Sequence, residues 1–126
     1  MTLLEIIIVI VILTILYSIS VPNFSKMAEK NKGENASFSL VAVANAEKRY
    51  KLDKAQYYLC AAPCNITTLN NELGVLINDS YFDYKIVGNT TVFEAIATRK
   101  GSEVCGGKTM KVTNENSTAV KGCDLW

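Results

Sequence analysis

The chain has 126 residues, about the length of one domain. Its 13 basic and 12 acidic residues give a net charge of +1, so composition offers no electrostatic reason to bind nucleic acid or anionic lipid. The charges are unevenly placed, because Glu5 is the only charged side chain before Lys26. We therefore expect two joined parts, an apolar N-terminal segment and an ordinary polar domain.

The N-terminal segment is apolar over most of its length. No residue from 6 to 21 is charged, and residues 6–13 are all Ile, Val or Leu. With residues 1–4 added, the stretch has about 20 residues, enough to span the hydrocarbon core of a bilayer. A helix that is apolar on all sides must be buried in lipid or in a bundle of similar helices. A simple secretory leader is not expected, because residues 1–4 contain no Lys or Arg and no small-residue cleavage site follows.

Pro22 ends the apolar segment and is expected to weaken the helix. It removes one backbone hydrogen bond and disfavours a helical conformation at Val21. We therefore expect a kink at Pro22 or a weak segment nearby. The hydroxyl groups of Thr14, Ser18 and Ser20 can offer hydrogen bonds to the backbone of such a segment.

A second helical stretch is predicted from Asn23 to about Asp53, where no further proline occurs and Ala, Glu, Lys and Leu are common. Its first part is expected to be polar and exposed, with Gly33 as its weakest point; the charged residues there are Lys26, Glu29, Lys30, Lys32 and Glu34. A helix continuous from Met1 to Asp53 would be on the order of 80 Å long at about 1.5 Å per residue. Its N-terminal half must then project from a domain of this size.

The stretch 36–46 is apolar on nearly every side. One stripe consists of Phe38, Val41, Ala42 and Asn45, and a second stripe consists of Leu40, Val43, Ala44, Glu47 and Tyr50. A helix with one side in water does not need both stripes. We therefore expect each stripe to face a different neighbour.

The remaining residues predict a loop followed by strands. Residues 54–79 contain Pro63 and a C-x3-C pair, with a short helix possible over 68–75. Strands are predicted over 81–87, 91–98, 108–113 and 118–121, and the Gly88-Asn89 turn joins the first two as a hairpin. Phe82, Tyr84 and Ile86 alternate and are expected to face the long helix. The predicted fold is α+β, with a long N-terminal helix packed on a small antiparallel sheet of three to four strands.

The four cysteines, Cys60, Cys64, Cys105 and Cys123, favour disulfides. A zinc site of four thiolates is the alternative, but zinc pairs usually have C-x2-C spacing, which neither pair here has. We favour the pairs Cys60–Cys64 and Cys105–Cys123, because the first closes a tight loop and the second ties the last strands together. Crossed pairing remains the alternative.

Residues 1–5, Met-Thr-Leu-Leu-Glu, and the Ile/Val run after them resemble the mature N-terminus of type IV pilins and type II secretion pseudopilins. The resemblance is specific over residues 1–24, including Glu5 and the Val21-Pro22 step. It is looser over the helix, loop and strands that follow, and Cys123 near Trp126 also looks like a pilin C-terminal region. The departures are Met1, where Phe is usual, and Thr14, where a small Gly or Ala is common.

The resemblance implies roles for several N-terminal residues. A prepilin peptidase would have removed a short basic leader, and Met1 would be N-methylated. Glu5 would pair with the Met1 amine of a neighbouring subunit, since an ionised carboxylate buried alone among apolar side chains is very costly. The alternative for Glu5 is an interaction with the dipole of its own helix. In a filament, we expect a non-helical stretch between about Thr14 and Asn23, a region that includes Pro22.

We expect a structural subunit, the major pilin of a type IV pilus-like filament at the cell surface, with an inner-membrane pool before assembly. Its partners would be copies of itself, the prepilin peptidase and the inner-membrane pilus or secretion machinery. The alternatives are a type II secretion pseudopilin or minor pilin, and, in another class, a membrane-anchored surface binding module. With no His, phosphate loop or nucleophile–base pair, the sequence predicts no enzyme activity, cofactor or metal site, and it implies no nucleic acid.

The expected organisation follows from these assignments. Residues 1–23 form the hydrophobic helix of the membrane or filament core, and residues 24–126 form a globular head. Within the head we expect an amphipathic helix over 24–53, a loop region over 54–80, and a sheet with the C-terminal disulfide over 81–126.

Overall fold

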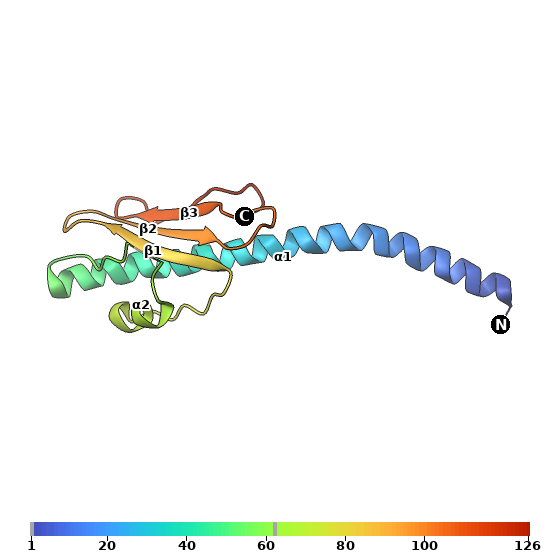
Figure 1. Cartoon of the computed structure of the whole chain (residues 1–126), viewed down its shortest axis with the longest axis horizontal. Coiled ribbons are helices and arrows are strands. Elements are labelled where there is room, and N and C mark those ends of the chain that lie inside the picture. Colours follow the sequence, from blue (N-terminus) through green and yellow to red (C-terminus); the bar gives the residue numbers. More distant parts are fainter. Residues whose placement is uncertain (1, 62) are drawn as a thin grey trace.

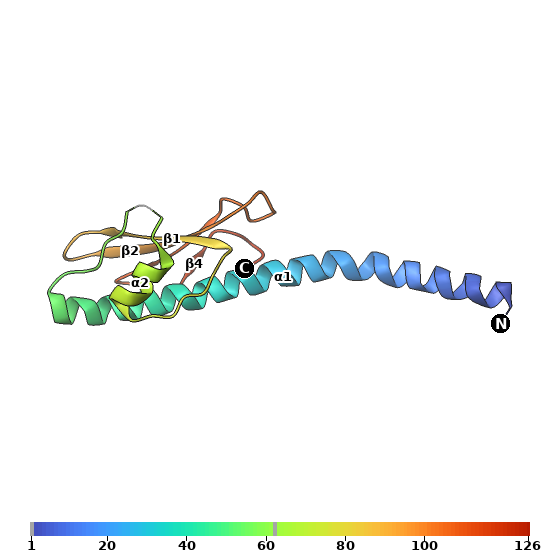
Figure 2. The same cartoon turned by 60° about the horizontal axis from the view of Figure 1, so that its bottom comes forward.

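The computed structural model describes residues 2–61 and 63–126. A single long helix, α1 (Leu3–Lys54), has 52 residues and forms a gently curved rod (Figures 1 and 2). At about 1.5 Å per residue its length is about 78 Å. The sheet and the other helix lie beside its C-terminal half, and the N-terminal half projects alone (Figure 1).

Local signals at both ends define α1. Thr2 is the N-cap and forms a reciprocal capping box with Glu5, which satisfies two backbone N–H groups at the helix start. At the other end Ala55 adopts a left-handed conformation with φ of 60°, and its N–H donates to the carbonyl of Lys51 at 2.8 Å. Pro22 lies inside the helix, which continues through it without interruption.

The expected α+β fold is confirmed. Four antiparallel strands lie in the order β1 (Phe82–Gly88), β2 (Phe93–Arg99), β3 (Thr109–Thr113) and β4 (Val120–Lys121). Tyr84 lies opposite Ala97, and Ala97 lies opposite Met110, so one row of side chains crosses three strands on the buried face. The predicted hairpin turns at Gly88-Asn89, where the Asn89 side chain accepts from the N–H groups of Thr91 and Val92.

A short helix, α2 (Ile66–Leu73), covers part of the core beside α1. It begins earlier than the predicted 68–75, because Asn65 is an N-cap whose Oδ1 accepts from the N–H of Thr67 at 2.9 Å. It ends at Gly74, which has a φ of 63°. The loop before α2 pairs with the outer edge of β1, since Cys60 and Ile86 exchange two backbone hydrogen bonds.

The two stripes predicted on the second half of α1 have different environments. Leu40, Val43 and Ala44 are buried against the sheet in the main core, where Phe82 and Phe93 are also fully buried. The other stripe faces away from the core, and its Phe38 is 70% exposed. The chain therefore covers only one of the two stripes itself.

One expectation about α1 was wrong. Residues 26–34 were predicted to be polar and exposed, yet Glu29 is 6% exposed and Gly33 is buried. The reason is the C-terminus, which folds back onto this part of α1. A Cβ atom at Gly33 would collide with the Trp126 ring, so glycine is what allows the indole to pack there.

Candidate functional site

The projecting half of α1 is the largest unburied apolar surface in the described chain. Its Ile, Leu, Val and Tyr side chains between Leu3 and Val21 are 45–79% exposed. The most apolar window of α1 has no buried residue and is long and apolar enough to cross a membrane. An uninterrupted apolar surface of this length needs lipid or protein to cover it.

Glu5 lies at the start of this surface and is bonded within its own chain. Its Oε2 accepts from the Thr2 N–H at 2.8 Å, and its own N–H donates to the Thr2 hydroxyl at 3.3 Å. These capping bonds were not predicted from the sequence, where the alternative to pairing between subunits was an interaction of Glu5 with the dipole of its own helix. Met1, the expected partner in a neighbouring copy, lies outside the described residues. Pairing between Glu5 and a Met1 amine therefore stays a prediction, as does methylation of Met1.

Hydroxyl groups line the segment where a break was predicted. Thr14, Ser18 and Ser20 donate to the carbonyls of Val11, Ile15 and Leu16, respectively, at 2.7–2.8 Å. Each such carbonyl is shared between a hydroxyl and the helix ladder, which weakens the helix locally. In the single chain this segment is part of the continuous helix α1. A break of the helix between Thr14 and Pro22 in an assembled filament stays a prediction.

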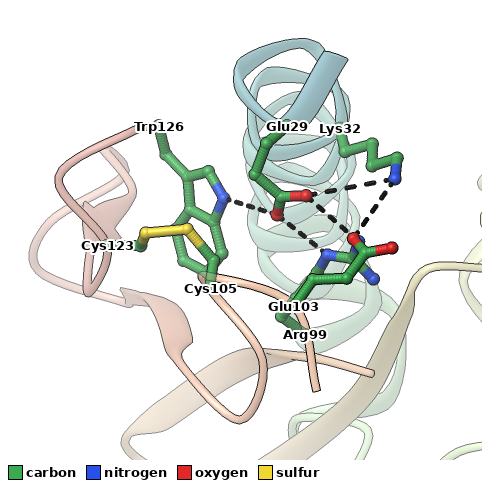
Figure 3. The surroundings of a disulfide bond; sticks show 7 residues. All are labelled: Glu29, Lys32, Arg99, Glu103, Cys105, Cys123 and Trp126. Carbon is green, nitrogen blue, oxygen red and sulfur yellow. Dashed lines mark hydrogen bonds and ion pairs between the residues drawn. A yellow bond between two sulfur atoms is a disulfide. The ribbon is translucent and has the colours of Figure 1, made fainter. Parts of the chain in front are cut away.

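An ion-pair cluster with a buried centre, Glu29 and Arg99, joins the head to α1 just beyond the projecting half (Figure 3). Arg99, at the end of β2, donates from Nε to Glu29 Oε1 at 2.9 Å and from Nη2 to Glu29 Oε2 at 3.1 Å. Arg99 also contacts Glu103, and Lys32 lies 3.6 Å from Glu103. The hydrogen bond from Arg99 lowers the pKa of Glu29 and raises that of Arg99, so both stay charged.

The C-terminus is fastened to the same place. Trp126 Nε1 donates to Glu29 Oε1 at 3.4 Å, its ring lies 5.4 Å from that of Phe82, and it packs over Gly33. The structure joins Cys105 to Cys123, three residues before Trp126 (Figure 3). This segment therefore connects the last loops of the head to α1.

The other disulfide in the structure joins Cys60 to Cys64, with Cα atoms 5.8 Å apart. Cys64 N–H donates to the Tyr84 carbonyl at 2.7 Å, so this small loop also lies along the edge of β1. The structure thus contains the two pairs that the sequence analysis favoured over a zinc site or crossed bonds.

Glu47 is a buried acid in the core stripe of α1. It is fully buried, and its Oε2 accepts from the Tyr58 N–H at 2.9 Å. Its Oε1 has no hydrogen-bond partner within the described part of the chain. Burial raises the pKa of Glu47 to about 7, and the Tyr58 hydrogen bond opposes this effect only in part.

The sequence analysis did not find the Glu29–Arg99 cluster or the role of Trp126. Glu29 lies among four other charged residues, and its partner Arg99 is 70 residues away. The sequence analysis did place Glu47 on the stripe of α1 that the core covers. Its position between Ala44 and Tyr50 on this otherwise apolar face was the signal that it would be buried.

Comparison with known proteins identifies relatives for part of the chain. A type II secretion system core protein G of Aeromonas hydrophila is 48% identical over 56 residues, and that of Escherichia coli K12 is 46% identical over 56 residues. The resemblance to the pilin and pseudopilin family is thereby confirmed. The matched stretch is 44% of this chain and 39% of each relative, so the chain matches less than half the length of these pseudopilins. No family model and no solved structure matches it.

Proposed function

We propose that the chain is a structural, non-enzymatic subunit of a pilin-like filament, and that this filament is the pseudopilus of a type II secretion system. The observation that carries the proposal is the projecting half of α1, whose apolar side chains are exposed on every side while the head has a core of its own. Such a surface is covered in lipid before assembly and by copies of itself afterwards. The names of the two pseudopilin relatives favour the secretion filament.

The uncovered stripe of α1 supports polymerisation over simple anchoring. A tethered head would need α1 to be apolar only inside the membrane. Yet Phe38 is 70% exposed on the head portion of α1, and Ala42 and Asn45 follow it on the same side. Small and apolar side chains on a helix face allow another helix to pack closely. We expect this stripe to contact neighbouring subunits.

Glu5 would act as the assembly checkpoint of the N-terminal half. In the single chain its carboxylate bonds to Thr2, an interaction that costs little to break at an exposed site. On entry into a filament it would exchange this bond for the Met1 amine of the neighbour. Two opposite charges among apolar side chains are tolerated only together, so the pair would set the register of the subunits.

A surface type IV pilus is the second candidate. Two disulfides within the head support it, because disulfides persist in oxidising environments outside the cytoplasm. The periplasm is also oxidising, so these bonds fit both filaments. We place the secretion filament first because the two relatives are proteins of a type II secretion system.

The test is a Glu5→Gln variant of the full chain in cells that carry their own secretion machinery. We expect normal membrane insertion but at least about a tenfold loss of filaments seen by electron microscopy, since the neutral amide cannot form the ion pair. Glu115→Gln, a matched change at an exposed acid of the head, should assemble normally.

The same cells separate the candidates. Loss of the chain should abolish export of secreted proteins if it builds a pseudopilus, and should remove surface fibres while leaving export intact if it builds a pilus. A wild-type chain that stays monomeric in the membrane, with Glu5→Gln harmless, would instead support a membrane-anchored binding module.

A further inference from the structure

We propose that a hollow at the base of the head receives the apolar N-terminal helix of a second copy of this chain. The hollow has a volume of about 440 Å³ and lies beside residues 24–32 of α1, just beyond the projecting half. Phe24 and Ala28 of α1 line it from one side, and Glu103 and Val104 of the β2–β3 loop line it from the other. The inference rests on the proposed function, because it requires that copies pack through α1.

Two large apolar side chains make this hollow an unsatisfied surface. Phe24 is 73% exposed and Val104 is 81% exposed, although the head has a well-packed core in which Phe82 and Phe93 are fully buried. Single exposed apolar residues are common, but two that line the same hollow form a patch that a partner can cover.

Val104 is held in place before any partner arrives. Its neighbour Cys105 is fully buried and disulfide-bonded to Cys123, while Glu103 on its other side pairs with Arg99. The backbone N–H of Gly106 donates to the Glu103 carbonyl at 2.7 Å, and this hydrogen bond closes the turn around Val104. A contact made by a residue whose backbone is already held in place loses less conformational entropy on binding.

Continuity with the projecting half of α1 identifies the occupant. Phe24 follows the exposed apolar residues 3–21 on the same helix, so the hollow extends that surface onto the head. The projecting half is about 30 Å long at 1.5 Å per residue. If a second copy lies beside the first and is displaced along α1 by less than this length of about 30 Å, its own residues 3–21 can lie across the hollow.

The polar rim distinguishes a helix from lipid as the occupant. Glu29, Lys32 and Glu103 lie at the hollow and are linked by ion pairs at 3.6–3.9 Å. Hydrocarbon chains offer no hydrogen bonds to such groups. The projecting helix offers Ile, Val and Leu for Phe24 and Val104, and the hydroxyl oxygens of residues such as Thr14 and Ser18 can accept a hydrogen bond from Lys32.

Photo-crosslinking tests the contact directly. The full chain carrying Val104→p-benzoylphenylalanine is assembled in its secretion-competent cells, irradiated, and its adducts are mapped by mass spectrometry. We expect adducts to residues 3–21 of another copy. Leu76→p-benzoylphenylalanine, at a site that is 93% exposed on the loop before β1, should give none with that segment. Adducts of the Val104 probe only to lipid, or only to the head of another copy, would overturn the proposal.

A charge placed in the hollow gives a second readout. Val104→Asp should lower filament yield about tenfold or more, because the new carboxylate would be buried by the incoming helix. Val104→Ala should have a smaller effect, and Leu76→Asp should stay within about twofold of wild type. An intact Cys105–Cys123 bond and unchanged Trp126 fluorescence confirm a folded head.

These outcomes separate the two proposals. Wild-type filaments together with normal assembly of Val104→Asp would overturn the docking site and leave the filament function standing. A wild-type chain that forms no filaments in its own cells would overturn both.

Discussion

Glu47 connects the stability of the head to pH. Its carboxyl group is fully buried, and burial raises its pKa from 4.5 to about 7. Between these values the folded chain binds more protons at this site than the unfolded chain, so stability falls as pH rises. The hydrogen bond from the Tyr58 N–H lowers the pKa of Glu47 but only partly offsets the effect of burial. The chain has no His, so few other groups titrate in this window.

We predict that the free energy of unfolding decreases by on the order of 2–3 kcal/mol between about pH 4.5 and pH 8, from this group alone. In the Glu47→Gln variant the amide carbonyl can still accept from Tyr58, and the amide does not titrate. The decrease in the free energy of unfolding with pH over this window should therefore largely disappear. Urea unfolding of the detergent-solubilised chain at several pH values measures it.

A matched control is Glu115→Gln, which changes an exposed acid of the head. Its stability should follow the wild-type pH dependence. A Glu47→Gln variant that keeps the wild-type slope would show that another group is responsible for the pH dependence.

At the scale of elements, periodicity predicted most of the fold. The run of residues 3–21 and the helix after Pro22 predicted α1, and alternation predicted the strands to within one or two residues. These signals are local, because each depends on the spacing of apolar side chains within one element. The stripe containing Leu40 and Val43 also identified the face that the sheet covers.

Contacts between distant elements were not predictable in the same way. Glu29 is buried because Arg99 reaches it from the end of β2, and Gly33 is buried because Trp126 returns from the C-terminus. No pattern within α1 distinguishes Glu29 from Lys30 beside it. The cluster of Figure 3 is thus a product of sheet topology, which places the ends of β2 and of the chain at the same point on α1.

The disulfide between Cys105 and Cys123 should stabilise the head more than the one between Cys60 and Cys64. The two bonds join residues 18 and 4 positions apart, respectively. Loop-closure entropy predicts a stabilisation of about 3 kcal/mol for the longer loop and about 2 kcal/mol for the shorter one. Replacing Cys105 and Cys123 with Ser should also release Trp126 from Gly33 and Phe82. Trp126 is the only tryptophan, so its fluorescence should shift to longer wavelength.

The double variant of Cys60 and Cys64 is the matched control. It should lose less stability and keep the wild-type emission of Trp126, because its loop bonds to the backbone of Tyr84 and Ile86 at the outer edge of β1, whereas Trp126 packs against Phe82 and Gly33. Equal red shifts in both variants would show that Trp126 reports general loosening of the head instead of the Cys105–Cys123 bond.

The molecule combines a head that packs its own core with a projecting N-terminal half of α1 that is exposed along the whole of its described length. Every residue in the main core lies at or beyond Ala36, and the buried ion pair begins at Glu29. Residues 1–23 should therefore be needed for membrane residence and assembly but not for folding. This is the division that we propose between the hydrophobic helix and the head formed by residues 24–126.

We predict that a chain starting at Phe24 is folded, monomeric and soluble without detergent, whereas the full chain requires detergent. Removing residues 1–23 takes away most of the exposed apolar surface and leaves only smaller patches such as those at Phe38 and Val104. The unfolding free energy of the truncated head should stay within about 1 kcal/mol of the full chain, because it loses no core contact. Light scattering measures whether the truncated chain is monomeric, and urea unfolding followed by Trp126 fluorescence measures its unfolding free energy. An aggregated or unfolded truncated chain would show that the projecting half also stabilises the head.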